Sequence, residues 1–529
     1  MNATRWTISL WAVVALGLLL RLHGIHDPIL DHPGWRQGDT AAIARNFAQL
    51  QFNVMYPQTS YNGPPPNYVE LELQIVPFLA AALYKAFGVH EIFGRLITLA
   101  FSLATIAMVG YFARWLFADA AAGIAAAFFY AIFPGSVYYG RTFMPDCAMV
   151  FFLTAALFAA ARTLVDAKRL GAREAAWPSG LLALAYLAKP VAVLALAPLG
   201  GMLWERARAK RGLAPLAVAA IVFAPLLLLW LYDRRVSSYA EWHWASGITR
   251  LHVLPALEAS LRSPGAFAAK LGQFRGVLGM LRETMLGRVS FWLAVAGFVA
   301  LPWANARSKA LLWSWLAGGL LYAFVVVTVE RVDYYLFPLL PLCALVIGAL
   351  LARFVALVRA ADAAPAARYA VLALVPLAAL AALLTSRQPV AAYYRYGKEV
   401  YRSAAYLNAT LPPDALVVIG HYGPEVQYYI ARFGWEEDPE LWTPFDEESA
   451  IRKGARYFVS IEDRRLHANL ELCAWLQRFP VQQSGLWPVY ETDPAKVLPH
   501  GQAFWRSFRA AERAGNGRAF LDERGLCRR

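Results

Sequence analysis

Charged residues are scarce in this sequence of 529 residues. They make up 16% of the chain and hydrophobic residues make up 59%, whereas soluble domains carry about 25% charged and about 45–50% apolar residues. The 4 cysteines are too few for a disulfide scaffold. No repeat with a fixed period of about 20–50 residues is found, which argues against a solenoid. This composition excludes a soluble enzyme.

The net charge of +14 belongs to one part of the chain. The residues from Ser386 to Arg529 hold 19 Lys/Arg against 18 Asp/Glu, which leaves 31 against 18 in the part before Ser386. Basic cytoplasmic loops of a membrane protein explain this excess better than a nucleic-acid footprint does. We therefore expect the lipid bilayer, and no nucleic acid, as a partner.

Long apolar runs recur through the first 384 residues, beginning with Trp6–Leu20. Runs that can cross a hydrocarbon core of about 30 Å indicate a polytopic membrane protein. The first run lacks a small-residue cleavage site, so we expect a retained span. We interpret Gln74–Phe87 as an interfacial helix, because it is short and contains Lys85. Gly180–Trp204 is interpreted as a hairpin, because Lys189-Pro190 interrupts it.

The positive-inside rule then sets the orientation. Eleven crossings place the N-terminus in the cytoplasm, basic loops such as Arg162–Arg173 and Arg206–Arg211 inside, and the C-terminal tail outside. The predicted location is the cytoplasmic (inner) membrane of a bacterium. The expected fold is an all-α domain of about 11 transmembrane helices over residues 1–385, with its first extracytoplasmic loop at 23–95. A small extracytoplasmic domain follows at 386–529.

The tail has the pattern of a small α/β domain. Its β-rich runs are Ala415–Ile419 and Tyr457–Ile461. They alternate with the helix-like stretches Glu399–Asn408 and Leu466–Arg478. Cys473 and Cys527 lie in this tail, and a disulfide bridge or two free thiols are both compatible with an oxidising compartment. The nine histidines form no HExxH motif and no His/Cys cluster, so no zinc site is predicted.

The first loop carries the densest group of polar residues. Its stretch WRQGDTAAIARNF is expected to form a helix from Asp39, with Asp39 as the N-cap, and this role alone would explain the aspartate. In the alternative interpretation, Asp31, Arg36 and Asp39 gather beside Trp35 at the membrane surface. Such a group is able to hold a hydroxyl and a phosphate together.

Several motifs, taken in order, resemble the membrane glycosyltransferases of the GT-C fold (glycosyltransferase family 39-like). The similarity is to bacterial relatives of protein mannosyltransferases, lipid A aminoarabinose transferases and rhizobial lipopolysaccharide core transferases. The motifs are the first-loop stretch, Tyr68-Val-Glu-Leu-Glu72, the helix ending at Phe87-Gly88, Arg141-Thr-Phe-Met-Pro-Asp146, Leu187-Ala-Lys-Pro190 and Asp333-Tyr-Tyr-Leu-Phe-Pro338.

The resemblance implies a polyprenyl-phosphate-linked sugar donor, transfer at the outer face of the membrane, and an acidic base in the first loop. The acceptor would be a hydroxyl of a glycan, a glycolipid or a protein. Relatives often carry Asp-Glu ahead of the first-loop helix, whereas this chain has Arg36-Gln37. The base therefore shifts to Asp39 or to Asp31.

Displacement of a lipid phosphate from a sugar also needs positive charge for the leaving group. Arg36, Arg141, Lys189 and Arg331 are expected at the outer interface and are candidate phosphate ligands; interfacial anchoring is the alternative for Arg141 and Arg331. No resident cofactor is implied, and the pattern leaves a divalent metal open.

Other residues have both a structural and a functional interpretation. Asp146 is either a helix-start acid or a second catalytic carboxylate. Glu70 and Glu72 would share one face of a strand and bind substrate, or lie in a solvated loop. Tyr334 and Tyr335 suit an aromatic belt or sugar stacking. The competing function is a lipid-linked sugar flippase or other transporter, which would place charges on broken helices at mid-membrane.

Overall fold

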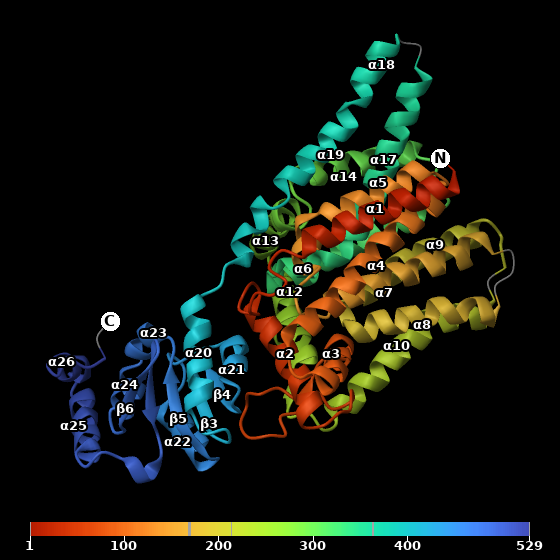
Figure 1. The fold of residues 1–529 in the computed structure, drawn as a ribbon. Helices are drawn as coiled ribbons and strands as arrows, with labels where there is room; N and C mark the ends of the chain where they lie inside the picture. The colour runs from red at the N-terminus through yellow and green to blue at the C-terminus, as the bar shows by residue number, and fades with distance from the viewer. Residues whose placement is uncertain (1, 168–170, 213, 362–363, 528–529) are drawn as a thin grey trace. The chain divides into compact units, whose positions relative to one another are not determined.

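The computed structural model describes residues 2–167, 171–212, 214–361 and 364–527 (Figure 1). Lys168 and Arg169 of the predicted basic loop therefore lie outside the described residues. The chain divides into two compact units, which we call the helical unit (1–26, 70–83 and 92–394) and the mixed unit (27–69, 84–91 and 395–529). Residues 27–69 of the predicted first loop thus group with the tail, and the domain boundary at residue 385 stays a prediction.

The helical unit consists of apolar helices. Seven of the described helical segments are long and apolar enough to cross a membrane, or up to eight if two segments joined at a bend of 116° form one span. The prediction of a polytopic membrane protein is confirmed at this level. The count of eleven stays a prediction, because it relies on shorter helices such as Ala120–Ile132.

The helices of this unit follow one another with short breaks. They are α1 (Ala3–Arg21), α3 (Ile75–Phe87, which continues into the mixed unit), α4 (Glu91–Phe117), α5 (Ala120–Ile132), α6 (Pro134–Tyr139), α7 (Asp146–Ala161), α8 (Ala172–Ala188), α9 (Leu196–Arg208), α10 (Pro215–Ser237), α11 (Trp244–Gly247), α12 (Leu254–Leu261), α13 (Pro264–Met280), α14 (Arg288–Ala300), α15 (Lys309–Tyr322), α16 (Thr328–Glu330), α17 (Leu340–Ala360), α18 (Pro365–Leu372) and α19 (Leu374–Thr385). Short 3-10 helices join several of these helices. They include η2 (Pro190–Ala195), η5 (Leu301–Trp303), η7 (Asp333–Leu339) and η8 (Gln388–Tyr394). A two-residue strand, β2 (Trp242–His243), precedes α11.

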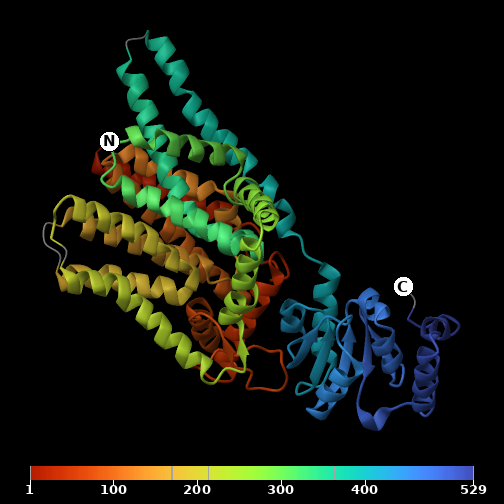
Figure 2. The same cartoon turned by 180° about the vertical axis from the view of Figure 1, so that it is seen from behind.

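The expected hairpin at Lys189-Pro190 is present in the structure. Helix α8 ends at Ala188 with Lys189 as its C-cap, and Pro190 starts the turn that leads into α9, because proline has no N–H to continue the helix. At the other end of α9, Arg206 donates hydrogen bonds to the carbonyl oxygens of Leu164 at 3.0 Å and Ala167 at 2.8 Å, just before α8 begins. The end of α9 therefore lies beside the segment that follows α7, and α7 to α10 form one group in both views (Figures 1 and 2).

Small residues allow the helices to pack closely. A Cβ atom at Gly348 of α17 would lie 2.5 Å from the carbonyl oxygen of Ala122 in α5, and one at Gly123 would lie 2.8 Å from the carbonyl oxygen of Gly110 in α4. Close backbone approach at small residues is how helices associate in lipid, where the hydrophobic effect gives little drive. Helices α4, α5 and α17 therefore pack closely at these glycines.

The mixed unit contains a five-stranded sheet with the strand order β4-β3-β5-β7-β6. Strand β3 pairs in parallel with β4 and β5, whereas β7 pairs antiparallel with β5 and β6. The strands are β3 (Leu416–Gly420), β4 (Gly434–Glu437), β5 (Ala455–Ser460), β6 (Val481–Ser484) and β7 (Trp487–Glu491). The predicted α/β tail is confirmed.

Helices of the mixed unit come from both the tail and the first loop. They are α2 (Gly34–Gln49), α20 (Lys398–Thr410), α21 (Pro424–Ile430), α22 (Pro444–Arg452), α23 (Asp463–Ala468), α24 (Leu470–Leu476), α25 (Gly501–Arg513) and α26 (Gly517–Asp522). Helix α22 begins with a capping box, in which the Thr443 hydroxyl accepts from the backbone N–H of Asp446 and the Asp446 carboxylate accepts from that of Thr443.

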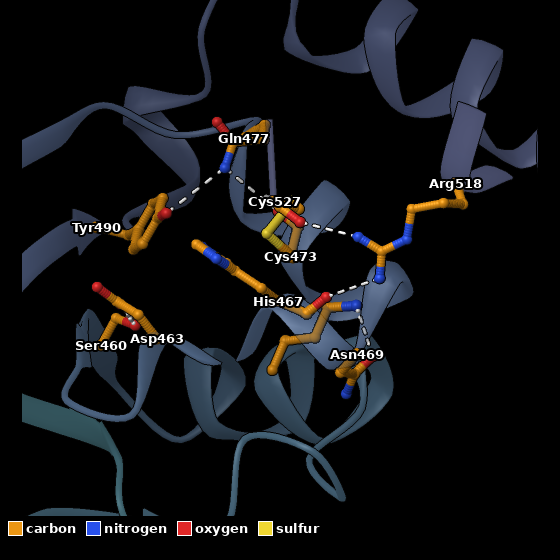
Figure 3. Close-up of a disulfide and its surroundings, with 10 residues drawn as sticks. Ser460, Asp463, His467, Asn469, Cys473, Gln477, Tyr490, Arg518 and Cys527 are labelled. Carbon is orange, nitrogen blue, oxygen red and sulfur yellow. Dashed lines mark hydrogen bonds between the residues drawn. A yellow bond between two sulfur atoms is a disulfide. The ribbon is translucent and has the colours of Figure 1, made fainter. Parts of the chain in front are cut away.

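Cys473 and Cys527 form a disulfide, which decides between the two alternatives that the sequence left open. The bridge joins α24 to the segment that follows α26. Arg518 of α26 donates hydrogen bonds to the carbonyl oxygens of Cys527 at 2.9 Å and His467 at 3.1 Å (Figure 3). The C-terminal segment is therefore attached to α24 by the disulfide and to α23 by the hydrogen bond from Arg518 to His467.

Candidate active site

Lys189 and Asp146 form a buried ion pair in the helical unit. The Nζ atom of Lys189 lies 2.6 Å from Oδ1 of Asp146, and their side chains are only 8% and 2% exposed. Lys189 is presented by the break between α8 and η2, and Asp146 is the first residue of α7. The sequence named both residues for separate roles, and the structure brings them into direct contact.

Two aromatic rings complete this cluster. The Lys189 Nζ atom lies 4.9 Å from the ring centre of Tyr334 and 4.8 Å from that of Tyr335, both in η7. An ammonium over aromatic faces is favoured by the ring quadrupole, and more so where water is excluded. Among the described residues, nothing donates a hydrogen bond to the buried Oδ2 atom of Asp146. The cluster therefore combines a held cation with one carboxylate oxygen that is able to accept from a hydroxyl.

Arg141 is fully buried and held by a carbonyl and two rings. It donates to the carbonyl oxygen of Gly24 at 3.0 Å, and its guanidinium lies 4.8 Å from the Tyr138 ring and 4.5 Å from the Tyr394 ring. Arg331, by contrast, is exposed and donates to the carbonyl oxygen of Thr328 at 3.4 Å. Among the described residues, no contact joins Arg331 to the Lys189 cluster.

Asp333 was not predicted as a site residue, although its motif was part of the resemblance. Its buried carboxylate accepts hydrogen bonds from the hydroxyls of Tyr139 at 2.5 Å and Tyr393 at 2.7 Å. These partners come from α6 and η8, far away in the sequence. The run of two tyrosines after Asp333 was the only local signal, and it does not reveal the tyrosines that bind the carboxylate.

Glu70 and Glu72 lie in different local settings. Glu70 is buried and accepts from the backbone N–H and the hydroxyl of Ser246, at 3.2 Å and 3.0 Å. Burial, together with a hydrogen bond shared with Asp233, raises the pKa of Glu70 to about 7. The strand β1 (Val69–Glu70) ends before Glu72, so the two carboxylates do not share a strand face as expected. Glu72 is nevertheless buried as well.

In the mixed unit, α2 places Asp39 differently from the expectation. The helix begins at Gly34 after the extended Pro33, so the prediction that Asp39 is the N-cap is wrong. Asp39 lies in the second turn, where its Oδ1 accepts from the Tyr61 hydroxyl at 2.8 Å. A Cβ atom at Gly38 would lie 2.6 Å from the backbone of Glu425, so close packing against α21 accompanies the earlier helix start.

The other first-loop candidates are buried beside this helix. Asp31 Oδ1 accepts from the Gln37 side-chain amide at 2.7 Å, and Arg36 is 8% exposed. Burial, and then the negative charge of Asp39, raise the pKa of Tyr61 well above its usual value, so Tyr61 stays a hydrogen-bond donor. The same two causes raise the pKa of Glu436 on β4. Tyr61 and Glu436 were missed from the sequence, because neither lies near Asp39 along the chain.

Among the residues that the structure describes, no group of three or more His, Cys, Asp or Glu side chains is arranged to hold a metal ion. Lysine and arginine side chains of the helical unit offer positive charge to a phosphate. Lys189 has a buried carboxylate and two aromatic rings around it.

Residues 74–230 match a family described as dolichyl-phosphate-mannose-protein mannosyltransferase. This segment contains Arg141, Asp146 and Lys189. No match is found among curated proteins. The match to the family therefore covers the part of the helical unit that carries three of the predicted site residues.

Solved structures share the fold of the chain. The apo oligosaccharyltransferase of Archaeoglobus fulgidus matches with a TM-score of 0.60 and 12% identity, over 94% of this chain and 76% of that one. ArnT from Cupriavidus metallidurans bound to undecaprenyl phosphate matches with a TM-score of 0.57 and 14% identity, over 94% and 100%. AglB from Archaeoglobus fulgidus, in complex with an inhibitory peptide and a dolichol-phosphate, matches with a TM-score of 0.55 and 14% identity. This match covers 93% of this chain and 75% of that one.

These matches show that the chain shares, over most of its length, the fold of solved GT-C membrane glycosyltransferases. The resemblance predicted from the sequence motifs is thus confirmed. Over residues 74–230, the chain is similar in particular to the mannosyltransferase family.

Proposed function

We propose that the protein transfers a sugar from a polyprenyl-phosphate-linked donor to an acceptor hydroxyl on the outer side of the cytoplasmic membrane. The observation that carries the proposal is the buried Lys189–Asp146 pair with its two tyrosine rings. Two proteins with a similar fold have been solved with a lipid phosphate bound: ArnT with undecaprenyl phosphate and AglB with a dolichol-phosphate. These complexes support a lipid phosphate as the leaving group.

In the proposed reaction, the bond between the anomeric carbon and the phosphate oxygen breaks, and the acceptor oxygen bonds to that carbon. The acceptor proton passes to a carboxylate, for which Asp39 is the first candidate and Asp31 the second. The bonding electrons leave with the polyprenyl phosphate, whose charge Lys189 stabilises. Asp146 Oδ2 accepts a hydrogen bond from a hydroxyl of the bound sugar. Arg36, Arg141 and Arg331 are further candidate phosphate ligands, and Glu70, Glu72, Tyr334 and Tyr335 are candidate contacts to the substrate.

Binding of undecaprenyl phosphate to the purified protein tests the leaving-group site. Lys189→Gln should weaken binding about tenfold or more, because a charge-assisted hydrogen bond to phosphate is lost. Lys398→Gln is the matched control, since Lys398 is an exposed lysine of α20 in the mixed unit. Equal affinity of wild type and Lys189→Gln would contradict the proposed role of Lys189.

The transfer itself is tested by deleting the gene and measuring surface glycolipids and glycoproteins by mass spectrometry. The proposal expects the loss of one sugar from one class of acceptor, with accumulation of its lipid-linked donor. An unchanged glycan profile with unchanged donor levels would contradict sugar transfer. Accumulation of the donor on the inner leaflet alone would instead support a flippase.

The proposed topology places the tail and the first loop outside and the end of α9 inside, with eleven crossings. Single cysteines at the exposed positions Pro64, Glu440 and Arg208 test it. A membrane-impermeant reagent added from outside should label the first two and not the third. The native thiols add little background, because Cys147 and Cys343 are buried and the other two are bridged.

A further inference from the structure

A groove lies on the helical unit between α9 and α15, with the turn η5 beside it. Its volume is about 810 Å³, and its lining includes Gly200, Trp204, Lys309 and Trp313. A volume of this size is typical of sites for lipid-sized or drug-sized ligands. None of the residues assigned above to sugar transfer lines the groove, so it needs a separate explanation.

The apolar part of the groove results from two adjacent glycines in α9. A Cβ atom at Gly201 would lie 2.3 Å from the Ser314 hydroxyl oxygen, so this glycine lets α9 approach α15 closely. A Cβ atom at Gly200 would meet nothing within 4 Å, so that position is open. Trp204 and Trp313, which also line the hollow, are 57% and 42% exposed. An open apolar hollow between two exposed indoles is suited to a hydrocarbon chain.

The groove also has a cationic end. The guanidinium of Arg208 lies 5.3 Å from the Trp204 ring, and Lys309 Nζ donates to the carbonyl oxygen of Pro302 at 2.6 Å. Arg353 donates a hydrogen bond to the carbonyl oxygen of Trp303, the residue that follows Pro302. Since an ammonium has three donors, the bond to Pro302 leaves Lys309 able to bind an anion.

The acidic residue in the lining does not cancel this charge for a ligand. Glu205 accepts from the Ser308 hydroxyl at 2.5 Å and from the backbone N–H of Ala310 at 3.0 Å, at the start of α15. Its carboxylate is thereby engaged with the N-terminus of the helix, where negative charge is stabilised. Glu205 is thus occupied at the start of α15, while Arg208 and Lys309 offer positive charge to a ligand.

We propose that this groove binds one anionic phospholipid of the cytoplasmic leaflet, with the phosphate at Arg208 and Lys309 and an acyl chain beside Gly200. Tryptophans at membrane interfaces and basic residues next to spans are the features that recruit anionic lipids. The proposal is independent of the sugar-transfer site, because it uses none of its residues. It rests on the orientation that places the basic end of α9 in the cytoplasm.

Native mass spectrometry of the full-length protein tests the proposal with phosphatidylglycerol and phosphatidylcholine of identical acyl chains. Wild-type protein should retain one phosphatidylglycerol in preference to phosphatidylcholine. Arg208→Gln and Lys309→Gln should each weaken that retention about fivefold, since a lysine or arginine at the membrane surface contributes about 1 kcal/mol of attraction to anionic lipid.

Gly200→Leu tests the position of the acyl chain. A Cβ atom at this position meets nothing within 4 Å, and the leucine side chain should occupy the hollow and abolish phosphatidylglycerol retention. Gly180→Leu in α8 is the matched control, because a Cβ atom there also meets nothing within 4 Å. Equal retention of the two lipids, or retention that survives Gly200→Leu, would overturn the proposal. Binding of undecaprenyl phosphate should stay unchanged in Gly200→Leu, which separates a failure here from a failure of the proposed function.

Discussion

The ammonium of Lys189 lies 2.6 Å from the carboxylate of Asp146, in a setting where both side chains are almost completely buried. Taking two charges out of water is costly, and their mutual attraction repays that cost only while both are present. The pair is therefore expected to be coupled in stability as well as in function.

A double-mutant cycle measures this coupling. Lys189→Met leaves the Asp146 charge buried without its cation and should destabilise the protein by about 3–5 kcal/mol. The double variant Lys189→Met/Asp146→Leu should lose less than the sum of the two single variants. Thermal unfolding of the purified proteins in one detergent gives the comparison. Additive losses would show that the two charges do not stabilise each other.

Stability should also fall as the pH rises through about 7, owing to Glu70. Its pKa is raised from 4.5 to about 7, first by burial and then by Asp233. The folded protein thus keeps a proton that the unfolded chain loses above pH 4.5. The stabilising contribution of this group is complete below pH 4.5 and is lost as the pH passes the folded pKa.

Thermal unfolding of the purified protein in one detergent, followed from pH 6 to pH 8, measures this transition. The unfolding temperature of the wild type should decrease over this range. Glu70→Gln should remove the decrease, because the amide does not titrate. The same pH dependence in both proteins would assign the effect to another group.

The Asp333 carboxylate should stabilise the helical unit through its two tyrosine partners. Asp333→Ala leaves the hydroxyls of Tyr139 and Tyr393 without this acceptor, at a cost of on the order of 1–3 kcal/mol for each. Adding Tyr139→Phe should recover part of the lost thermal stability, because one of the two hydroxyls is then absent. If the second substitution destabilises the protein further, the tyrosine acts independently of Asp333.

The sequence predicted the parts of the site that depend on local signals. Lys189-Pro190 interrupts an apolar run, and a charge and a helix breaker in such a place indicated a hairpin with an exposed or paired lysine. Asp146 follows Met144-Pro145 at a helix start, which marked it as a candidate. That these two residues contact each other depends on the packing of α7 against α8, which one sequence does not reveal.

Long-range partners could not be predicted for the same reason. Asp333 binds hydroxyls 194 and 60 residues away along the chain. The start of α2 was placed at Asp39 because aspartate is a favoured N-cap, whereas Gly34 and Gly38 pack against Glu425 and the helix begins earlier. In both cases tertiary contacts decided what local preference did not.

Asp39 is the predicted acceptor base, and its position inside α2 now allows a clean test. Asp39→Asn keeps an oxygen that is able to accept the hydrogen bond from Tyr61. Because Asp39 lies inside α2 and is not its N-cap, the substitution does not change a helix cap. Loss of a general base should lower turnover by roughly 10²–10⁴, while the thermal stability stays close to that of the wild type. Tyr61→Phe is the matched control for the hydrogen bond alone and should reduce turnover less. Near wild-type turnover in Asp39→Asn together with an inactive Asp31→Asn would assign the base to Asp31, and activity in both variants would contradict a single carboxylate base in the first loop.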